Sequence, residues 1–173
     1  MRFDQSVKQV LLVCVCFFAL TGNAMADSLA DAKRAYDAKD YEKAAKLYST
    51  LAEHGDVVAE LRLAEMYEDG TGVLQDYKKV AKLAQRAAEQ GNAEGQLLLA
   101  TLYQHGEGVQ KNFLEAYMWS NIAAVHGNPL GSQSPAIIKR DTLAKFMTAS
   151  QIAEAQELAR KCTANKFKGC EKL

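Results

Sequence analysis

The sequence predicts an all-α fold, an α-solenoid of about three antiparallel helix pairs followed by C-terminal capping helices. Its composition, a repeat of 36 residues and the helical spacing of apolar residues in each copy predict this fold. Of the 173 residues, 49% are hydrophobic and only 2 are Pro, while Ala, Leu, Glu and Lys are abundant. Because these abundant residues lose little rotamer freedom in a helix, we expect almost no strand.

The charge of the chain is balanced. Lys and Arg together number 21, and so do Asp and Glu. There is therefore no net positive field to draw the chain onto a polyphosphate backbone, and nucleic acid is not an expected partner.

A repeat organises residues 27–127. Five kinds of position recur at an interval of 36 residues: Gly55, Gly91 and Gly127; Tyr67 and Tyr103; Gly70 and Gly106; Gly72 and Gly108; Val73 and Val109. After each copy of the glycine loop, apolar or small residues follow at offsets 0, 3, 4, 7, 10 and 11, which lie on one face of a helix. The helix beginning at Tyr41 carries the same stripe.

Another helix precedes each of the later two striped helices and forms the first helix of the pair, at about residues 56–69 and 92–105. Asp56 and Asn92 suit the N-cap positions of these helices, and Gly70 and Gly106 suit their C-terminal ends. The first pair, about residues 28–54, has only residues 37–40 between its helices. Since a single helix pair cannot bury both of its faces, neighbouring pairs must stack.

The two glycine loops carry a family resemblance. Tyr67-x-x-Gly70-x-Gly72-Val73 and its copy Tyr103-x-x-Gly106-x-Gly108-Val109, each followed by a helix ending in Ala-Ala-x-x-Gly, resemble Sel1-like repeats. The resemblance implies a tetratricopeptide-like solenoid that binds other proteins. Ala64 and Ala100 depart from the pattern, because the family usually has Gly there at a close helix contact.

Residues 128–173 do not repeat, and we expect them to cap the array within the same domain. Ser134 and Pro135 predict the start of a helix that runs to about Met147, after a loop over residues 128–134. Thr148 and Gln151 form a capping-box pattern at the start of a last helix, which we expect from Ile152 to about Cys162. The stretch from Arg140 to Gln156 also resembles the closing segment found after Sel1-like arrays.

Residues 1–26 have the pattern of a secretory signal peptide cleaved after Ala26. Basic residues precede an apolar run of 11 residues from Val10 to Leu20, and Ala24 and Ala26 lie two apart. An uncleaved anchor is less favoured, because a helix of this length rises about 16 Å, whereas the hydrocarbon core is about 30 Å thick. We therefore expect a periplasmic or secreted protein with no stable membrane insertion after cleavage.

Cys162 and Cys170 are the only thiols that would remain after cleavage. In an oxidising compartment they predict a disulfide that ties the last helix to the tail. A metal or redox pair is the alternative, but their spacing matches neither CxxC chemistry nor the usual zinc sites, and no His lies nearby in the sequence. No metal and no cofactor is expected.

The histidines and the single Trp are better explained by structure than by chemistry. His54, His105 and His126 each stand at the end of a predicted helix, where a cation favours the helix dipole. Trp119 takes the place of Leu47 and Leu83 in the other copies, which predicts core packing rather than stacking on a ligand.

No catalytic residue is predicted, and we do not expect an enzyme. The sequence has no Ser-x-x-Lys, Lys-Thr-Gly or Gly-x-Ser-x-Gly pattern, so it lacks the local signatures of serine β-lactamases and α/β-hydrolases. The glycine loops have no Gly-Lys-Ser/Thr after them, which argues against a phosphate site. Hydrolysis of a β-lactam or cell-wall substrate nevertheless remains an alternative hypothesis, as does a structural role in an envelope assembly.

The expected function is therefore recognition of an unknown protein or peptide by a scaffold or adaptor in the cell envelope. In stacked helix pairs the first helix of each pair tends to line the concave side, which offers an extended binding face. By analogy with tetratricopeptide grooves, the expected partner-binding residues are Glu60, Arg62, Glu65, Gln96, Leu98 and Thr101.

Overall fold

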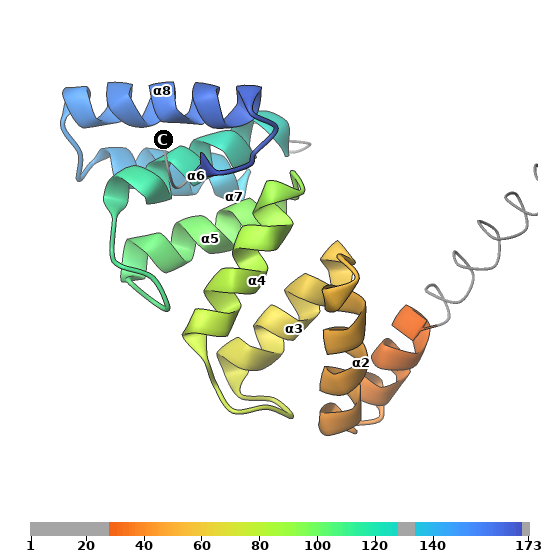
Figure 1. Ribbon diagram of the computed structural model, residues 1–173. Coiled ribbons are helices and arrows are strands. Elements are labelled where there is room, and N and C mark those ends of the chain that lie inside the picture. The colour runs from red at the N-terminus through yellow and green to blue at the C-terminus, as the bar shows by residue number, and fades with distance from the viewer. Residues whose placement is uncertain (1–27, 128–133, 171–173) are drawn as a thin grey trace, which may run out of the picture.

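The computed structural model describes residues 28–127 and 134–170, and within them the secondary structure consists of helices joined by turns and loops, with no strand (Figure 1). This confirms the predicted all-α solenoid. After a first helix over residues 28–37, the elements are α2 (Tyr41–Glu53), α3 (Val57–Asp69), α4 (Tyr77–Glu89), α5 (Ala93–His105), α6 (Phe113–His126), α7 (Pro135–Ala144) and α8 (Ala149–Ala164).

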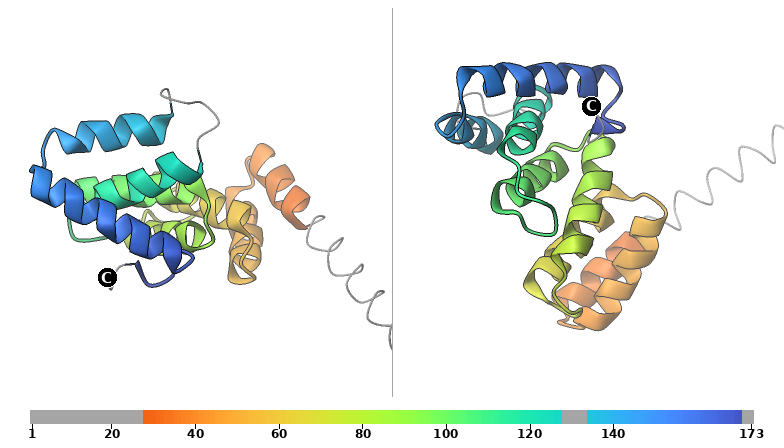
Figure 2. Two further views of the ribbon diagram at one scale, coloured as in Figure 1. Left: turned by 90° about the horizontal axis from the view of Figure 1, so that it is seen from above. Right: turned by 60° about the vertical axis from the view of Figure 1, so that its left-hand side comes forward.

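The helices pack in chain order, as expected of a solenoid. Contacts join α2 to α3, α3 to α4, α4 to α5 and α5 to α6, after which α6 is covered by both α7 and α8. Figure 2 shows the successive hairpins stepping away from the first helix and ending beneath α8. Each hairpin thus buries its second face against the next, and α7 and α8 cover the last one.

The ends of α3 and α5 follow from their capping residues. The side chains of Asp56 and Asn92 each accept a hydrogen bond from a backbone amide of the first turn, at 2.9 Å. At the other ends, Gly70 and Gly106 have φ angles of 71° and 78°, in the left-handed conformation that closes a helix. Both helices therefore begin and end within one residue of the positions that the sequence predicts.

The repeated stripe contributes many of the small residues of the core. The stripe residues buried in α2, α4 and α6 are Ala44, Ala45, Tyr48, Leu51 and Ala52; Val80, Ala81, Ala84, Ala87 and Ala88; and Ala116, Tyr117, Ser120, Ala123 and Ala124. Trp119, predicted to pack in the core, is fully buried, and so are Ala64 and Ala100. Alanine at most of these positions lets the helix backbones approach closely.

The glycine loops fix the spacing between successive hairpins. Gly72 and Gly108 have φ angles of 72° and 71°, and a Cβ at either position would overlap the backbone of a helix in the preceding hairpin. Gly72 lies on Tyr41 at the start of α2, and Gly108 lies on Tyr77 at the start of α4. Both members of this contact are 36 residues from their counterparts, so the repeat length in the sequence corresponds to one step of the solenoid.

The C-terminal cap differs from the prediction at several helix ends. Helix α7 stops at Ala144 rather than near Met147, and Ser134, although it occupies the N-cap position, makes no side-chain capping bond. The predicted capping box of Thr148 and Gln151 is present, but α8 starts at Ala149 and continues to Ala164, beyond both predicted ends. Of the predicted loop over residues 128–134, residues 128–133 lie outside the described part of the chain.

Cys162 and Cys170 are joined in the structure, as the sequence predicts, with their Sγ atoms 2.00 Å apart and their Cα atoms 5.1 Å apart. The bond holds a turn that brings Phe167 back onto the array. The Phe167 ring lies edge-on to His126 at the end of α6, 5.4 Å between ring centroids, and against Gly91 in the turn between α4 and α5. The tail therefore contacts two hairpins, a role that the spacing of the cysteines alone did not reveal.

No described helix is long and apolar enough to cross a membrane. The predicted signal peptide lies within residues 1–27, outside the described residues, and its cleavage after Ala26 stays a prediction.

Candidate functional site: the first-helix face

We use the term first-helix face for the exposed and half-buried side chains of residues 28–37, α3 and α5, the first helices of the three hairpins. Two hollows lie along it, one between residues 28–37 and α3 and the other between α3 and α5. The prediction placed partner binding on these helices, and the structure shows which of their side chains reach the surface.

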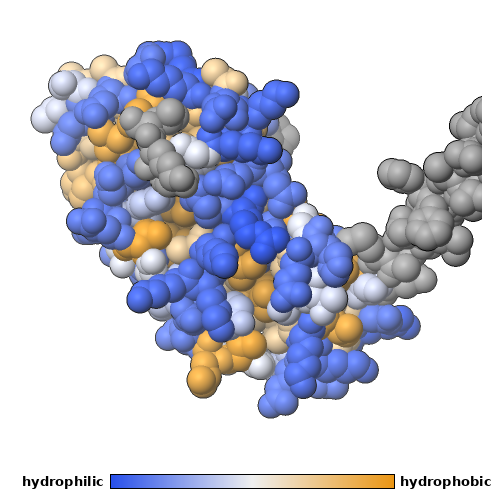
Figure 3. All heavy atoms as spheres, in the orientation of Figure 1, coloured by the Kyte–Doolittle hydropathy of each residue, from blue (hydrophilic) through white to orange (hydrophobic). Residues whose placement is uncertain are grey.

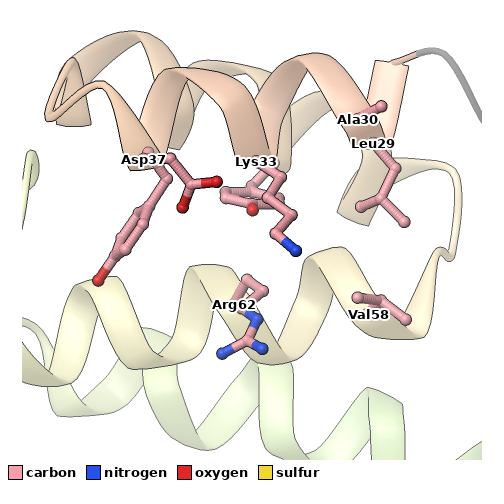
Figure 4. A pocket seen from close by; sticks show the side chains of 8 residues that line it. Leu29, Ala30, Lys33, Asp37, Val58 and Arg62 are labelled. Carbon is pink, nitrogen blue, oxygen red and sulfur yellow. The ribbon is translucent and has the colours of Figure 1, made fainter.

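The larger hollow, which we call the N-terminal cleft, has a volume of about 620 Å³. Figure 4 shows Lys33 from the first helix and Arg62 from α3 extending into the gap between the helices, with Leu29 and Val58 toward one end and Asp37 toward the other. The complete lining is Leu29, Ala30, Lys33, Tyr36, Asp37, Tyr48, Val58 and Arg62.

The N-terminal cleft combines apolar walls with polar groups. Val58 is about half exposed, at 52%, although it is apolar. Burial raises the pKa of the Tyr48 phenol, and nearby Arg62 opposes part of this rise, so Tyr48 stays neutral at physiological pH. The Arg62 guanidinium donates to Glu65 at 2.8 Å, which raises the pKa of Arg62. The cleft can therefore receive apolar groups beside two cations and a single carboxylate.

The second hollow, which we call the acidic hollow, has a volume of about 280 Å³. Its lining is Leu61, Glu65, Glu68, Glu94, Leu97, Leu98 and Thr101. Burial raises the pKa of Glu68, and repulsion from Asp69, Glu107 and Glu65 adds to the rise. Carboxylates from two different helices thus surround an apolar floor.

Four of the six predicted partner-binding residues line these hollows. Arg62 lies in the N-terminal cleft, while Glu65, Leu98 and Thr101 lie in the acidic hollow. Partner binding at these four positions stays a prediction, and the sequence did not indicate Lys33, Glu68 or Glu94, which line the same hollows. Their charge indicates that these three side chains lie outside the core, but the sequence could not show which of the two hollows each one lines.

Glu60 and Gln96 were wrongly predicted to lie on the binding face. Both side chains are fully buried, so neither can contact a partner. Glu60 forms an ion pair with Arg86 of α4 at 2.7 Å and accepts a hydrogen bond from Gln90 at 3.0 Å. Gln96 donates to the backbone carbonyl of Ala88 at 3.3 Å. Both side chains contact α4, which is the second helix of Glu60's own hairpin and belongs to the hairpin before that of Gln96.

The Glu60 ion pair also connects three helices. Arg86 on α4 reaches Glu60 on α3 and donates to the Ala52 carbonyl near the end of α2. Burial raises the pKa of the Glu60 carboxyl, and Arg86 opposes part of that effect. A carboxyl with a raised pKa is often catalytic, but this one is sealed from solvent and has defined protein partners, which favours a structural role.

The histidines contact structural elements. His54, at the end of α2, lies with its Nδ1 2.7 Å from the carbonyl of Thr50, and His126 packs against Phe167. His105 is the last residue of α5. In the described ranges, no group of three or more His, Cys, Asp or Glu side chains could hold a metal ion.

The sequence matches the Sel1 repeat in three consecutive copies, at residues 33–56, 57–92 and 93–128. The chain belongs to the Sel1 repeat family. Sel1 repeat proteins are generally scaffolds for interactions between proteins, and they are typically not catalytic. No curated protein matches this chain.

The solved structures that resemble this Sel1 repeat protein include the following two. One is c5321, a protective antigen present in uropathogenic Escherichia coli strains, with a TM-score of 0.72 and 22% identity over 86% of this chain and 32% of that chain. The other is a Sel1 repeat protein from Oxalobacter formigenes, with a TM-score of 0.53 and 30% identity over 59% of this chain and 41% of that chain. The chain therefore spans less than half the length of either protein.

A further groove lies between α6 and α8, with a volume of about 510 Å³. Asn121 and Val125 of α6 and Gln156 and Arg160 of α8 are among its lining residues, and Val125 is 68% exposed. Sequence reasoning missed this groove because it depends on how the cap crosses the last Sel1 repeat.

Proposed function

We propose that this Sel1 repeat protein is exported and acts in the cell envelope as a scaffold or adaptor, holding a segment of another protein against its first-helix face. The observation that carries the proposal is the pair of adjoining hollows on that face. They are lined by side chains from α3 that are not needed to pack the hairpins, including Arg62 and Glu65.

The polar and apolar character of the hollows suits a protein segment. An extended segment can place apolar side chains in the N-terminal cleft and in the acidic hollow, while its polar groups meet the charged rims. Since the array has three repeats, the face is short, and a transient contact of modest area is expected.

Export is the second part of the proposal. Its support is the basic start, apolar run and small residues of the first 26 positions, together with a cysteine pair suited to an oxidising compartment. If export occurs as proposed, sequencing the N-terminus of the protein purified from its host finds Asp27 first. A chain that retains Met1 would contradict cleavage.

Binding is tested by photo-crosslinking in the host. A photoreactive amino acid replaces Val58, which is exposed in the N-terminal cleft, and in a control protein it replaces Lys46, which is exposed on α2. The proposal expects a discrete crosslinked protein from position 58 and none from position 46. Crosslinks from position 46 alone, or from neither position, would contradict binding on this face.

A further inference from the structure

The acidic hollow has more negative charge than the ion pairs around it balance. Glu65 is paired with Arg62 at 2.8 Å. Glu68 and Glu94 have no ion-pair partner within residues 28–127 and 134–170. Repulsion from Asp69, Glu107 and Glu65 acts on Glu68, which is itself half-buried. Gathering like charges in this way disfavours the folded state, and a bound cation would relieve the repulsion.

The repeats themselves show that the fold does not require this charge. At the equivalent positions 36 residues away, Thr101 replaces Glu65, Gln104 replaces Glu68, and Val58 replaces Glu94. By contrast, the residues that hold the hairpins together, such as the tyrosines and glycines of the loop, are the same in both copies. The three carboxylates are therefore specific to this one hollow.

The floor of the acidic hollow is apolar. Leu61 is buried beneath it, and Leu97 and Leu98 are half-buried at its surface. Its volume of about 280 Å³ lies just below the range for small-molecule sites, roughly 300–1,000 Å³, and leaves room for one or two side chains. More generally, Figure 3 shows hydrophobic residues exposed among hydrophilic ones on the face of the molecule in view.

We propose that the acidic hollow binds a lysine- or arginine-bearing, otherwise apolar segment of the partner protein. The aliphatic stem of such a side chain lies along Leu97 and Leu98 while its charged end reaches Glu68 and Glu94. Charge complementarity decides the choice of partner, because an acidic segment would meet three carboxylates. This inference rests on the proposed function and specifies the chemistry of the segment that is bound.

Two short peptides test the inference, one alternating leucine with lysine and the other alternating leucine with glutamate. Each is titrated into the isotope-labelled protein, purified from its host, and followed by NMR. The inference expects the leucine–lysine peptide to shift the amide signals of Leu61, Leu97 and Leu98, and to bind more weakly as salt is raised. Equal affinity for the leucine–glutamate peptide would overturn it. So would equal affinity for spermidine, which has the charge without the apolar groups.

A pair of matched variants locates the binding. The double variant E68Q/E94Q removes the two carboxylates without an ion-pair partner, and E42Q/E154Q removes the same charge from exposed positions on α2 and α8. The first is expected to weaken binding of the leucine–lysine peptide about tenfold, while the second leaves it nearly unchanged. Equal weakening in both would show that only net charge matters and would overturn the inference.

The crosslinked partner separates failure of the inference from failure of the proposed function. Suppose that position 58 captures a protein, and that this protein dissociates from E68Q/E94Q no faster than from E42Q/E154Q. The acidic hollow then does not select a cationic segment, and the inference is wrong while the proposed function stands. If position 58 captures nothing, the proposed function itself is wrong.

Discussion

Replacing Gly108 by Ala should destabilise the protein more than the same change at Gly55. Both glycines have positive φ angles, 71° at Gly108 and 83° at Gly55. A Cβ at Gly55 would have no atom within 4 Å, whereas a Cβ at Gly108 would overlap the backbone of Tyr77. The two substitutions therefore share the backbone strain and differ in the contact between a loop and the preceding hairpin.

The expected magnitudes follow from these two contributions. Placing an L-residue in the left-handed conformation costs about 1–2 kcal/mol, which applies to both variants. Forcing an extra methyl group into a packed contact costs typically about 1–3 kcal/mol more. We expect Gly55→Ala to lower the free energy of unfolding by about 1–2 kcal/mol and Gly108→Ala by about 2–5 kcal/mol.

Urea denaturation followed by circular dichroism measures the difference. For both variants the midpoint should fall while the slope with urea stays constant, since the amount of surface exposed on unfolding is unchanged. Equal destabilisation of the two variants would refute the reasoning that the glycine loops pack against the preceding hairpin and so fix the spacing between successive hairpins.

Three further predictions test other parts of the structure. The double variant Cys162→Ser/Cys170→Ser should lower the free energy of unfolding by about 2–3 kcal/mol in urea denaturation, and no change would contradict a stabilising bond. Because the pKa of Glu60 is raised in the folded protein, the folded state binds this proton more tightly than the unfolded state does. Relative to Glu60→Gln, the wild type should therefore gain stability as the pH falls from 7 toward 4.5 and lose stability as the pH rises. A difference in stability between the two proteins that does not depend on pH would contradict this. Arg62→Glu combined with Glu65→Arg should change the free energy of unfolding by less than about 0.5 kcal/mol, because the exposed ion pair is kept with reversed polarity. The same double variant should abolish pull-down of the partner. Retained pull-down would argue against the first-helix face.

The fold could be predicted from the sequence because its determinants are local and repeated. Asp56 and Gly70 mark the two ends of α3 by capping chemistry that acts within a few residues, and Asn92 and Gly106 do the same for α5. The alanine stripe specifies which face of each second helix is buried. Because each hairpin contacts its neighbours in chain order, these local signals also determine the arrangement of the whole array.

The binding face was less predictable because burial at its edges depends on distant residues. Glu60 is charged and lies on the helix expected to bind a partner, but Arg86, in the next helix along the chain, draws it into the interior. Gln96 is buried at the equivalent place in the next hairpin. Likewise, Lys33 and Arg62 reach the same cleft only because of how the first helix lies on α3. The spacing of residues within one helix carries no information about which side chains of different helices line the same cleft.

A methyl NMR spectrum of the protein bound to its captured partner tests most directly whether recognition occurs on the first-helix face. Val58 and Leu98 report from the two hollows, while Leu74, 90% exposed, and Val125, 68% exposed, report from other surfaces. The account predicts that the partner shifts the methyl signals of Val58 and Leu98 and leaves those of Leu74 and Val125 in place. Shifts confined to Leu74 or Val125 would contradict it.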